Sequence, residues 1–479
     1  MTPQDLLTGN QHHLIAQGKA ILMTSPDRGE RPNILVLCMD QWDAHMDLPP
    51  GVDLPAIQRL TGAGGGPSVD WLRHKRPEDK PWFLVSSMVN PHDIMFLRAG
   101  DDEQARRNGA LAPLTHPPQD LGFMREYDVE LPANFHDDLD VQPYGVRSYK
   151  RSTEWNYGSI PADREDLWKV RRNYLINCLR MVDQEFQKIF DELDRLDLWR
   201  NTVVLFTSDH GEMNGAHGLA QKGAIPFQEA AVVNMTVVSP RGPSGVRCDA
   251  VGSHVDLAPT FLSWAGMAEA EMRQQYPALK GRDLRGVFEA PNQSRPPRGS
   301  TSEPGAGALI SWDGLNMLDP EWSIQGALGE LTQLGAGSNK TLQDCLNVGE
   351  KFGAPDMEKR TFFRAVSDGR HKLVRWFSPT QYGIPATVEE LYATSDVALY
   401  DLVADPGEMR NIADPEHPDY DADLVAAMLK KLVSLLEEEL GQDDSPFDLN
   451  LFGTREVRYQ LDDVTVGAPA GSQATEPRL

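Results

Sequence analysis

Three runs of apolar residues, each followed by hard polar side chains, restrict most strongly how this chain can fold. The runs are NILVLCM (33–39), PWFLVSSMV (81–89) and TVVLF (202–206). A strand that is apolar on both faces, as the first run is, belongs at the centre of a parallel sheet covered by helices. A fourth run, NMTVV (234–238), stops at Ser239-Pro240. The pattern predicts an α/β fold built on a mostly parallel sheet.

A helix is expected between the second and third runs. Its apolar residues recur at spacings of 4, 3, 4, 3 and 4, which places them on one stripe: Leu175, Leu179, Val182, Phe186, Ile189 and Leu193. Strand, helix and strand in succession are typical of a doubly wound sheet.

The pattern changes in the second half of the chain. Residues 291–306 are rich in Pro, Ser and Gly and are predicted to form a linker or long surface loop. Residues 362–377 alternate imperfectly around Asp368-Gly369, which indicates a hairpin. A helix is expected over 422–440. We therefore expect four parts: an N-terminal extension (1–30), an α/β core (31–298), a smaller C-terminal subdomain (299–464) and a disordered tail (465–479).

Charge and composition exclude several classes of partner. The 479 residues include 46 lysines and arginines against 71 aspartates and glutamates, a formal charge of −25. Such a surface repels nucleic acid and anionic membranes, and an anionic ligand would need a local positive site. No apolar run approaches the ~20 residues of a membrane span, and the first residues lack a signal-peptide core. The four cysteines form no Cys-x-x-Cys pair. We expect a cytoplasmic protein with reduced thiols.

The polar residues that follow the three strands are the first candidates for chemistry. They are Asp40-Gln41, His92-Asp93 and Asp209-His210. In an open α/β sheet the ligand site lies beyond the carboxyl ends of the strands, so these pairs can converge. A single aspartate after a strand often caps the next helix instead. Several such groups in one sheet favour a site for a hard divalent cation such as Ca²⁺ or Mg²⁺.

A glycine-rich loop follows the third strand and contains Lys222. Its ammonium group could hold an oxygen of an anionic ester, although a lone lysine is usually a solvated surface residue. His217 is equally compatible with stabilising the loop and with contacting a substrate. His254 is interpreted as structural.

Six segments resemble successive landmarks of the sulfatase family, within the alkaline-phosphatase-like superfamily. They occur in family order between residue 31 and about residue 413: RPNILVLCMDQW, KPWFLVSSMVNPHD, NTVVLFTSDHGEMNGAHGLAQKG, HVDLAPTFLSWAGM, LKGRDL and LYDLVADPGEMRNIA. The DQW, PHD and DHGEM variants are similar to those of bacterial arylsulfatases and phosphonate monoester hydrolases.

The resemblance implies a fold, a metal and residue roles. The fold is an α/β/α sandwich followed by a small antiparallel sheet packed with one C-terminal helix. The metal is a divalent ion, Ca²⁺ first and Mg²⁺ or Mn²⁺ as alternatives, with four implied ligands: Asp40, Gln41, Asp209 and His210. By the same resemblance His92 contacts the ester and assists the leaving group, and Lys222 binds a sulfate oxygen. The metal polarises the ester and holds the nucleophile.

One departure concerns the nucleophile. Family sulfatases use a formylglycine made from the cysteine of a Cys-x-Pro-x-Arg motif, and none of the four cysteines here begins that motif. A look-alike at residues 24–28 (TSPDR) precedes the first strand and is interpreted as a decoy. The family's Lys-x-His segment is not found either, and the interval from Leu60 to Pro81 is far shorter than the resemblance implies. Thr61 and Ser68 are the nearest hydroxyls and are interpreted as ordinary loop residues.

The sequence therefore predicts a metal-dependent sulfuric ester hydrolase of the arylsulfatase type, impaired by loss of the nucleophile segment. Two alternatives stay open: a phosphonate or phosphate ester hydrolase, and a non-catalytic binding protein with a sulfatase fold. The expected partner is a small anionic ester. Assembly into a homo-oligomer is compatible with the sequence.

Overall fold

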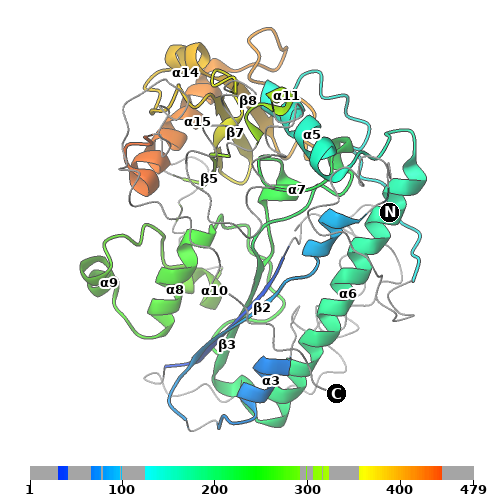
Figure 1. The fold of residues 1–479 in the computed structure, drawn as a ribbon. Coiled ribbons are helices and arrows are strands. Elements are labelled where there is room, and N and C mark those ends of the chain that lie inside the picture. The colour runs from blue at the N-terminus through cyan, green and yellow to red at the C-terminus, as the bar shows by residue number, and fades with distance from the viewer. Residues whose placement is uncertain are drawn as a thin grey trace, which may run out of the picture.

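In the part of the chain that the structure describes, two four-stranded sheets organise the fold (Figure 1). The computed structural model describes residues 31–40, 66–76, 79–97, 99, 125–291, 298, 306–314, 317–322 and 355–444. The predicted N-terminal extension and tail, together with Gln41 and Thr61, lie outside these residues. The domain boundaries stay a prediction.

The first sheet carries the strands predicted from the apolar runs. Its order is β2 (Phe83–Met88), β1 (Asn33–Met39), β3 (Thr202–Ser208) and β4 (Met235–Val238). Both β2 and β3 pair with β1 in parallel, whereas β4 pairs with β3 in the antiparallel sense. The chain leaves β3 at its carboxyl end and enters β4 from that same end, so β4 must run back. The prediction of a mostly parallel sheet is confirmed, with β4 as the exception.

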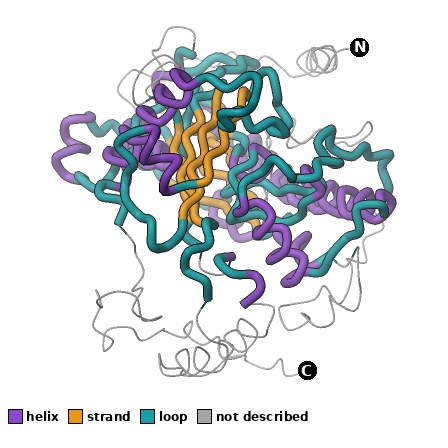
Figure 2. The backbone as a smooth tube through the Cα atoms, turned by 90° about the horizontal axis from the view of Figure 1, so that it is seen from above, coloured by secondary structure: helices purple, strands orange, loops and turns teal. Residues whose placement is uncertain are grey.

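Helices cover both faces of this sheet (Figures 1 and 2). The long helix α6 (Glu165–Arg195) and the short helix α3 (Gly66–Leu72) pack on one face. All six residues of the predicted apolar stripe on α6 are at most 3% exposed. The other face is covered by α8 (Leu257–Trp264) and α10 (Arg285–Glu289), with Trp264 in its core. The α/β/α sandwich expected from the resemblance is therefore present.

Strand β2 forms one edge of the described part of this sheet. Its side chains Phe83 and Val85 are 52% and 50% exposed, and Val89, the residue after the strand, is 72% exposed. Strands of parallel sheets are normally covered on both faces, so this exposure is unusual. The uncovered edge belongs to the strand that follows the shortened interval between Leu60 and Pro81.

The second sheet is wholly antiparallel. Its order is β5 (Ala308–Trp312), β6 (Phe362–Ser367), β7 (His371–Phe377) and β8 (Asp396–Asp401). The predicted hairpin is β6–β7, and Gly369 in its turn has a positive φ of 91°. Helix α15 (Ala422–Leu435), continued by the π-helical turn η7 (Leu436–Leu440), packs against this sheet. The predicted hairpin and C-terminal helix are both confirmed.

Arg298 corrects the prediction that residues 291–306 form only a linker or surface loop. Its side chain is 1% exposed, and it donates two hydrogen bonds of 2.7 Å to the fully buried carboxylate of Asp256. A third hydrogen bond, 2.8 Å long, goes to Glu439. A planar guanidinium makes strong, directional hydrogen bonds with two carboxylates, and these bonds offset the loss of hydration on burial. Composition alone does not reveal such a partner set.

Shorter helices connect these elements. They are η1 (His92–Phe96), α5 (Tyr144–Tyr157), η2 (Trp199–Asn201), η3 (Ala216–Gly218), α7 (Gln228–Ala231), η4 (His254–Asp256), α9 (Glu269–Gln275), α11 (Pro320–Trp322) and α14 (Val388–Thr394). Within the described ranges, no helix has both the length and the apolarity that a bilayer crossing requires.

Candidate metal and anion site

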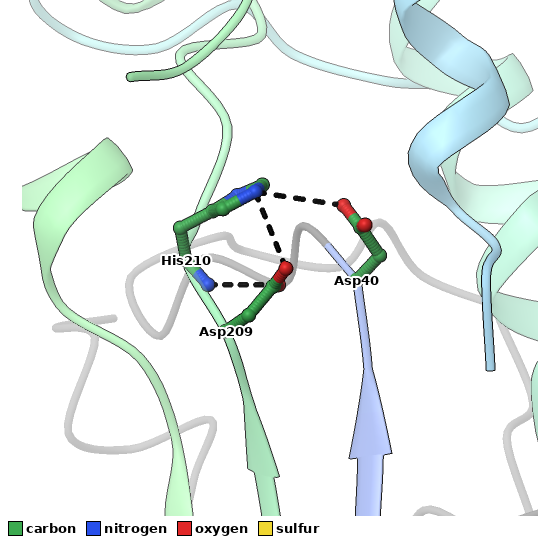
Figure 3. Close-up of side chains that lie close together, drawn as sticks. All are labelled: Asp40, Asp209 and His210. Atoms are coloured by element: carbon green, nitrogen blue, oxygen red, sulfur yellow. Dashed lines mark hydrogen bonds and ion pairs between the residues drawn. The ribbon is translucent and has the colours of Figure 1, made fainter. Parts of the chain in front are cut away.

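The ends of β1 and β3 bring two predicted acidic residues side by side (Figure 3). Met39 pairs with Ser208, so Asp40 and Asp209 are the next residue on each strand. One ligand atom from each of Asp40, Asp209 and His210 lies within 4.8 Å of the other two. His210 Nε2 lies 3.7 Å from Asp40 Oδ1 and 3.4 Å from Asp209 Oδ2. Three of the four predicted metal ligands therefore meet, and the fourth, Gln41, lies outside the described residues.

Local hydrogen bonds set the direction of the His210 ring. Its Nδ1 lies 3.0 Å from the carbonyl oxygen of Gly211 and can donate a proton to it. In that tautomer the lone pair of Nε2 faces the two carboxylates, the arrangement common in metal-binding histidines. Ser208 Oγ lies 2.8 Å from both Met39 O and His210 O, which ties the two strand ends together.

The electrostatics of this cluster fit a bound cation. Burial raises the pKa of Asp40, and the negative charge of Asp209 raises it further. Asp40 Oδ1 is buried and accepts no hydrogen bond within the described part of the chain. The facing donors are two carboxylates and an imidazole nitrogen. Carboxylate oxygens suit Ca²⁺, Mg²⁺ or Mn²⁺, and a divalent cation would neutralise their mutual repulsion.

Lys222, in the loop that follows β3, interacts electrostatically with the same cluster. Burial lowers the pKa of this half-buried lysine, while the negative charges of Glu212, Asp40 and Asp209 act in the opposite direction. Its Nζ atom lies 3.7 Å from Met95 Sδ. The loop thus supplies a positive charge beside the acidic residues, as an anionic ligand in this negatively charged protein would need.

His92 approaches the cluster from β2. It is the first residue of η1, shortly after the carboxyl end of that strand, and its electrostatic interaction with Asp40 lowers the pKa of that carboxyl group. The structure therefore places both predicted ester-binding residues, His92 and Lys222, within electrostatic reach of Asp40.

Two other histidines have structural roles. His217 is fully buried, its Nδ1 lies 2.6 Å from Asp137 Oδ2, and its ring stacks on Phe227 at a centroid distance of 3.8 Å. These contacts favour loop stabilisation among the two roles left open for it. His254 Nε2 lies 3.2 Å from Thr207 Oγ1.

Sequence reasoning missed a buried ion pair behind the site. Arg171 Nη2 donates to Glu212 Oε1 at 2.7 Å, with the two side chains 2% and 0% exposed. One signal was available, because Arg171 precedes Leu175 by four residues and so continues the apolar stripe of α6. A charged residue at a stripe position requires a buried partner.

No activated nucleophile is found near the cluster within the described ranges. Burial, together with the charges of Asp209 and Asp40, raises the pKa of the Cys38 thiol to about 11. That thiol is therefore protonated at neutral pH and weakly nucleophilic. Ser68 lies on α3 and donates its hydroxyl proton to Ser86 Oγ at 2.9 Å.

A family model described as Sulfatase matches residues 67–267. This match covers about two fifths of the chain and shows that these residues are similar to the sulfatase family. The matched residues include His92, Asp209, His210 and Lys222, whereas Asp40 lies before them.

Several curated relatives agree with this assignment. The chain is similar to the uncharacterized sulfatase YidJ of Escherichia coli, with 27% identity over 221 residues, which is 46% of this chain and 39% of the relative. It is also similar to the choline-sulfatase of Rhizobium meliloti, with 25% identity over 219 residues, 45% of this chain and 41% of the relative. The matches thus span about two fifths of the length of these relatives.

Solved structures support the sulfatase fold over most of the chain. A protein from Bacteroides thetaiotaomicron assigned as a sulfatase superposes with a TM-score of 0.53 and 15% identity, covering 87% of this chain and 96% of the other. A 2-O GAG sulfatase superposes with a TM-score of 0.51 and 14% identity, covering 88% and 96%.

Proposed function

We propose that this protein is a metal-dependent sulfuric ester hydrolase of the arylsulfatase type with slow turnover. The observation that carries the proposal is the convergence of Asp40, Asp209 and His210 at the strand ends, with a lysine beside them. In the proposal these three residues and Gln41 hold one divalent cation. Ca²⁺ is our first choice because most of the donors are oxygens, with Mg²⁺ and Mn²⁺ as the alternatives.

The chain's own residues would bind and orient the ester. The bound cation would act as a Lewis acid that polarises the ester oxygens. The Lys222 ammonium would pair with a sulfate oxygen, and the imidazolium form of His92 would give a proton to the leaving oxygen and become neutral. Both side chains act electrostatically with Asp40 in the structure, which supports their assignment to one site.

Slow turnover follows from the missing nucleophile motif. Two-step covalent hydrolysis needs an activated side chain, and Ser68 and Cys38 do not supply one. The metal and Lys222 would still stabilise developing charge, an effect of roughly 10²–10³-fold per well-placed donor. The same observation favours a second candidate, a sulfatase-fold protein that binds anionic esters without hydrolysing them.

Steady-state kinetics with an aryl sulfate and the matching aryl phosphonate test the proposal. We expect slow, metal-dependent hydrolysis of the sulfate. Hydrolysis of the phosphonate alone would refute the sulfatase assignment, and binding of sulfate without turnover would favour the second candidate. Turnover equal to that of an intact relative would reveal a nucleophile that we have missed, with Thr61 and Ser68 the first residues to substitute.

Two substitutions separate the proposed roles. Asp209→Ala should lower the metal content, because the cation loses a carboxylate oxygen. Lys222→Ala should weaken sulfate binding and leave the metal in place, because the ammonium contacts only the anion. Elemental analysis after dialysis measures the metal. Equal loss of metal from both variants would contradict the separate roles.

The names of the relatives indicate different substrates, because one relative is an arylsulfatase of Clostridium perfringens and another is a choline-sulfatase of Rhizobium meliloti. For this chain we propose a small sulfuric ester, with an aryl sulfate as the first substrate and choline sulfate as the second. The expected cytoplasmic location and self-association stay predictions.

A further inference from the structure

A buried arginine on α6 contacts both segments that carry the proposed ester-binding residues. Arg171 Nη1 donates to the carbonyl oxygen of Ile94 at 3.1 Å, within η1, which begins at His92. Arg171 Nη2 donates to Glu212 Oε1 at 2.7 Å, at the start of the loop that ends in Lys222. One guanidinium therefore touches both segments while it is itself 2% exposed.

Glu212 extends this connection to the residue next to Lys222. Its Oε1 atom accepts the backbone N–H of Gln221 at 2.7 Å. The side chain of Gln221 in turn donates to the carbonyl oxygen of Met95 at 3.2 Å, which returns the connection to η1. Helix α6, η1 and the loop are thus joined in a closed set of hydrogen bonds with the ion pair at its centre.

Because the pair is buried, we expect it to fix the positions of its neighbours more than it stabilises the fold. A buried ion pair contributes little net stability compared with apolar side chains of the same size, because both charges lose their hydration. An arginine and a carboxylate nevertheless hold their partners in fixed directions. Neither Arg171 nor Glu212 belongs to the cluster of proposed metal ligands.

We propose that Arg171 and Glu212 are positioning residues that hold His92 and Lys222 in register for one anionic ester. The roles of His92 and Lys222 rest on the function proposed above. The pair acts on the geometry of the anion site and leaves the metal cluster at the ends of β1 and β3 unchanged. The chain thus contains two separable parts of one site, one for the cation and one for the anion.

The test uses the full chain with Arg171→Met and Glu212→Gln. Lys431→Met is the matched control, because it breaks the buried pair between Lys431 on α15 and Asp368 in the β6–β7 turn. Each protein is titrated with Mn²⁺ alone, and the metal-loaded protein is then titrated with inorganic sulfate. Hydrogen exchange followed by mass spectrometry reports on residues 92–96 and 212–222.

We expect both site variants to bind Mn²⁺ within about twofold of the wild type and to bind sulfate at least tenfold more weakly, because displacement by about 1 Å strongly weakens oriented contacts. Hydrogen exchange should accelerate in both segments. The control should lose thermal stability and keep its sulfate affinity. Combining Arg171→Met with Glu212→Gln should add little further loss, since both remove the same interaction.

Unchanged sulfate affinity in the site variants, or an equal loss in the control, would overturn the proposal. Should Arg171→Met fail to fold, Arg171→Lys keeps the charge but has a single ammonium in place of the planar fork, and it should show the same loss of sulfate. A wild-type protein that binds no sulfate would refute the proposed function instead. In that case hydrogen exchange alone would test whether Arg171 and Glu212 hold the two segments in place. Unchanged exchange in both segments of the variants would overturn the positioning role.

Discussion

Replacing Asp40 by asparagine should have opposite effects on the metal-free and the metal-loaded protein. Without metal, Asp40 and Asp209 are two carboxylates that face each other at no more than 4.8 Å, and Asp40 Oδ1 accepts no hydrogen bond from the described residues. Asparagine keeps the shape of the side chain and removes one charge. Asp40→Asn should therefore stabilise the metal-free protein.

The size of this effect follows from Coulomb's law. Two unit charges at this separation repel by about 3.5 kcal/mol at an effective dielectric constant of about 20. Asp209 is 47% exposed and Asp40 17% exposed, so water screens the repulsion and about 1–2 kcal/mol is a better expectation. For a protein of this size each kcal/mol raises Tm by about 1–2 °C.

The metal-loaded protein should respond in the opposite sense. At a free metal concentration one hundred times Kd, the free energy of unfolding of the wild type should rise by about 2.7 kcal/mol. That of the variant should rise much less, because the variant has lost a metal ligand. Differential scanning fluorimetry after EDTA treatment, and again with added Ca²⁺ or Mn²⁺, measures both effects. Asp70→Asn is the control, because Asp70 is 70% exposed and pairs with Arg73 on the surface. A lower Tm for metal-free Asp40→Asn, or an undiminished response to metal, would refute the reasoning.

Three further outcomes test the packing around the site. Arg298→Met should lower the free energy of unfolding, measured with urea, by about 3–5 kcal/mol, because it leaves buried carboxylates unpaired. A loss below about 1 kcal/mol would contradict the buried geometry. Burial raises the pKa of Asp368, but hydrogen bonds from backbone N–H groups and from Lys431 outweigh it, so the pKa lies below its usual value. The stability from Asp368 is therefore present above about pH 4 and lost on further acidification, and Asp368→Asn should flatten this part of a Tm-against-pH curve. Gly281→Ala should lower Tm by several degrees, since its Cβ would lie 1.8 Å from the carbonyl oxygen of Val255, whereas an unchanged Tm would show that this backbone can move.

Much of the fold was predictable because it depends on local patterns. The stripe on α6 and the apolar strands describe surfaces that must be buried, whatever their partners. The convergence of Asp40 and Asp209 follows from parallel pairing on β1, which places consecutive strand ends at one edge. The direction of β4 depends on a loop path, and strand composition does not encode it.

Residues buried through distant partners could not be predicted in this way. Arg298 lies in a stretch with linker composition, and it is buried because Asp256 and Glu439 approach it from other parts of the chain. Arg171 depends on Glu212, which is 41 residues away. The burial of Arg298 follows from tertiary contacts alone, whereas the stripe of α6 indicates that Arg171 is buried but does not identify Glu212 as its partner.

A crystal structure of the full chain grown with Mn²⁺ and sulfate tests the central claim most directly, because the anomalous signal of Mn²⁺ identifies the ion. We predict an anomalous peak bounded by Asp40, Asp209 and His210, with a sulfate oxygen within hydrogen-bonding distance of Lys222 Nζ. A peak elsewhere, or a sulfate that binds away from Lys222, would contradict the account.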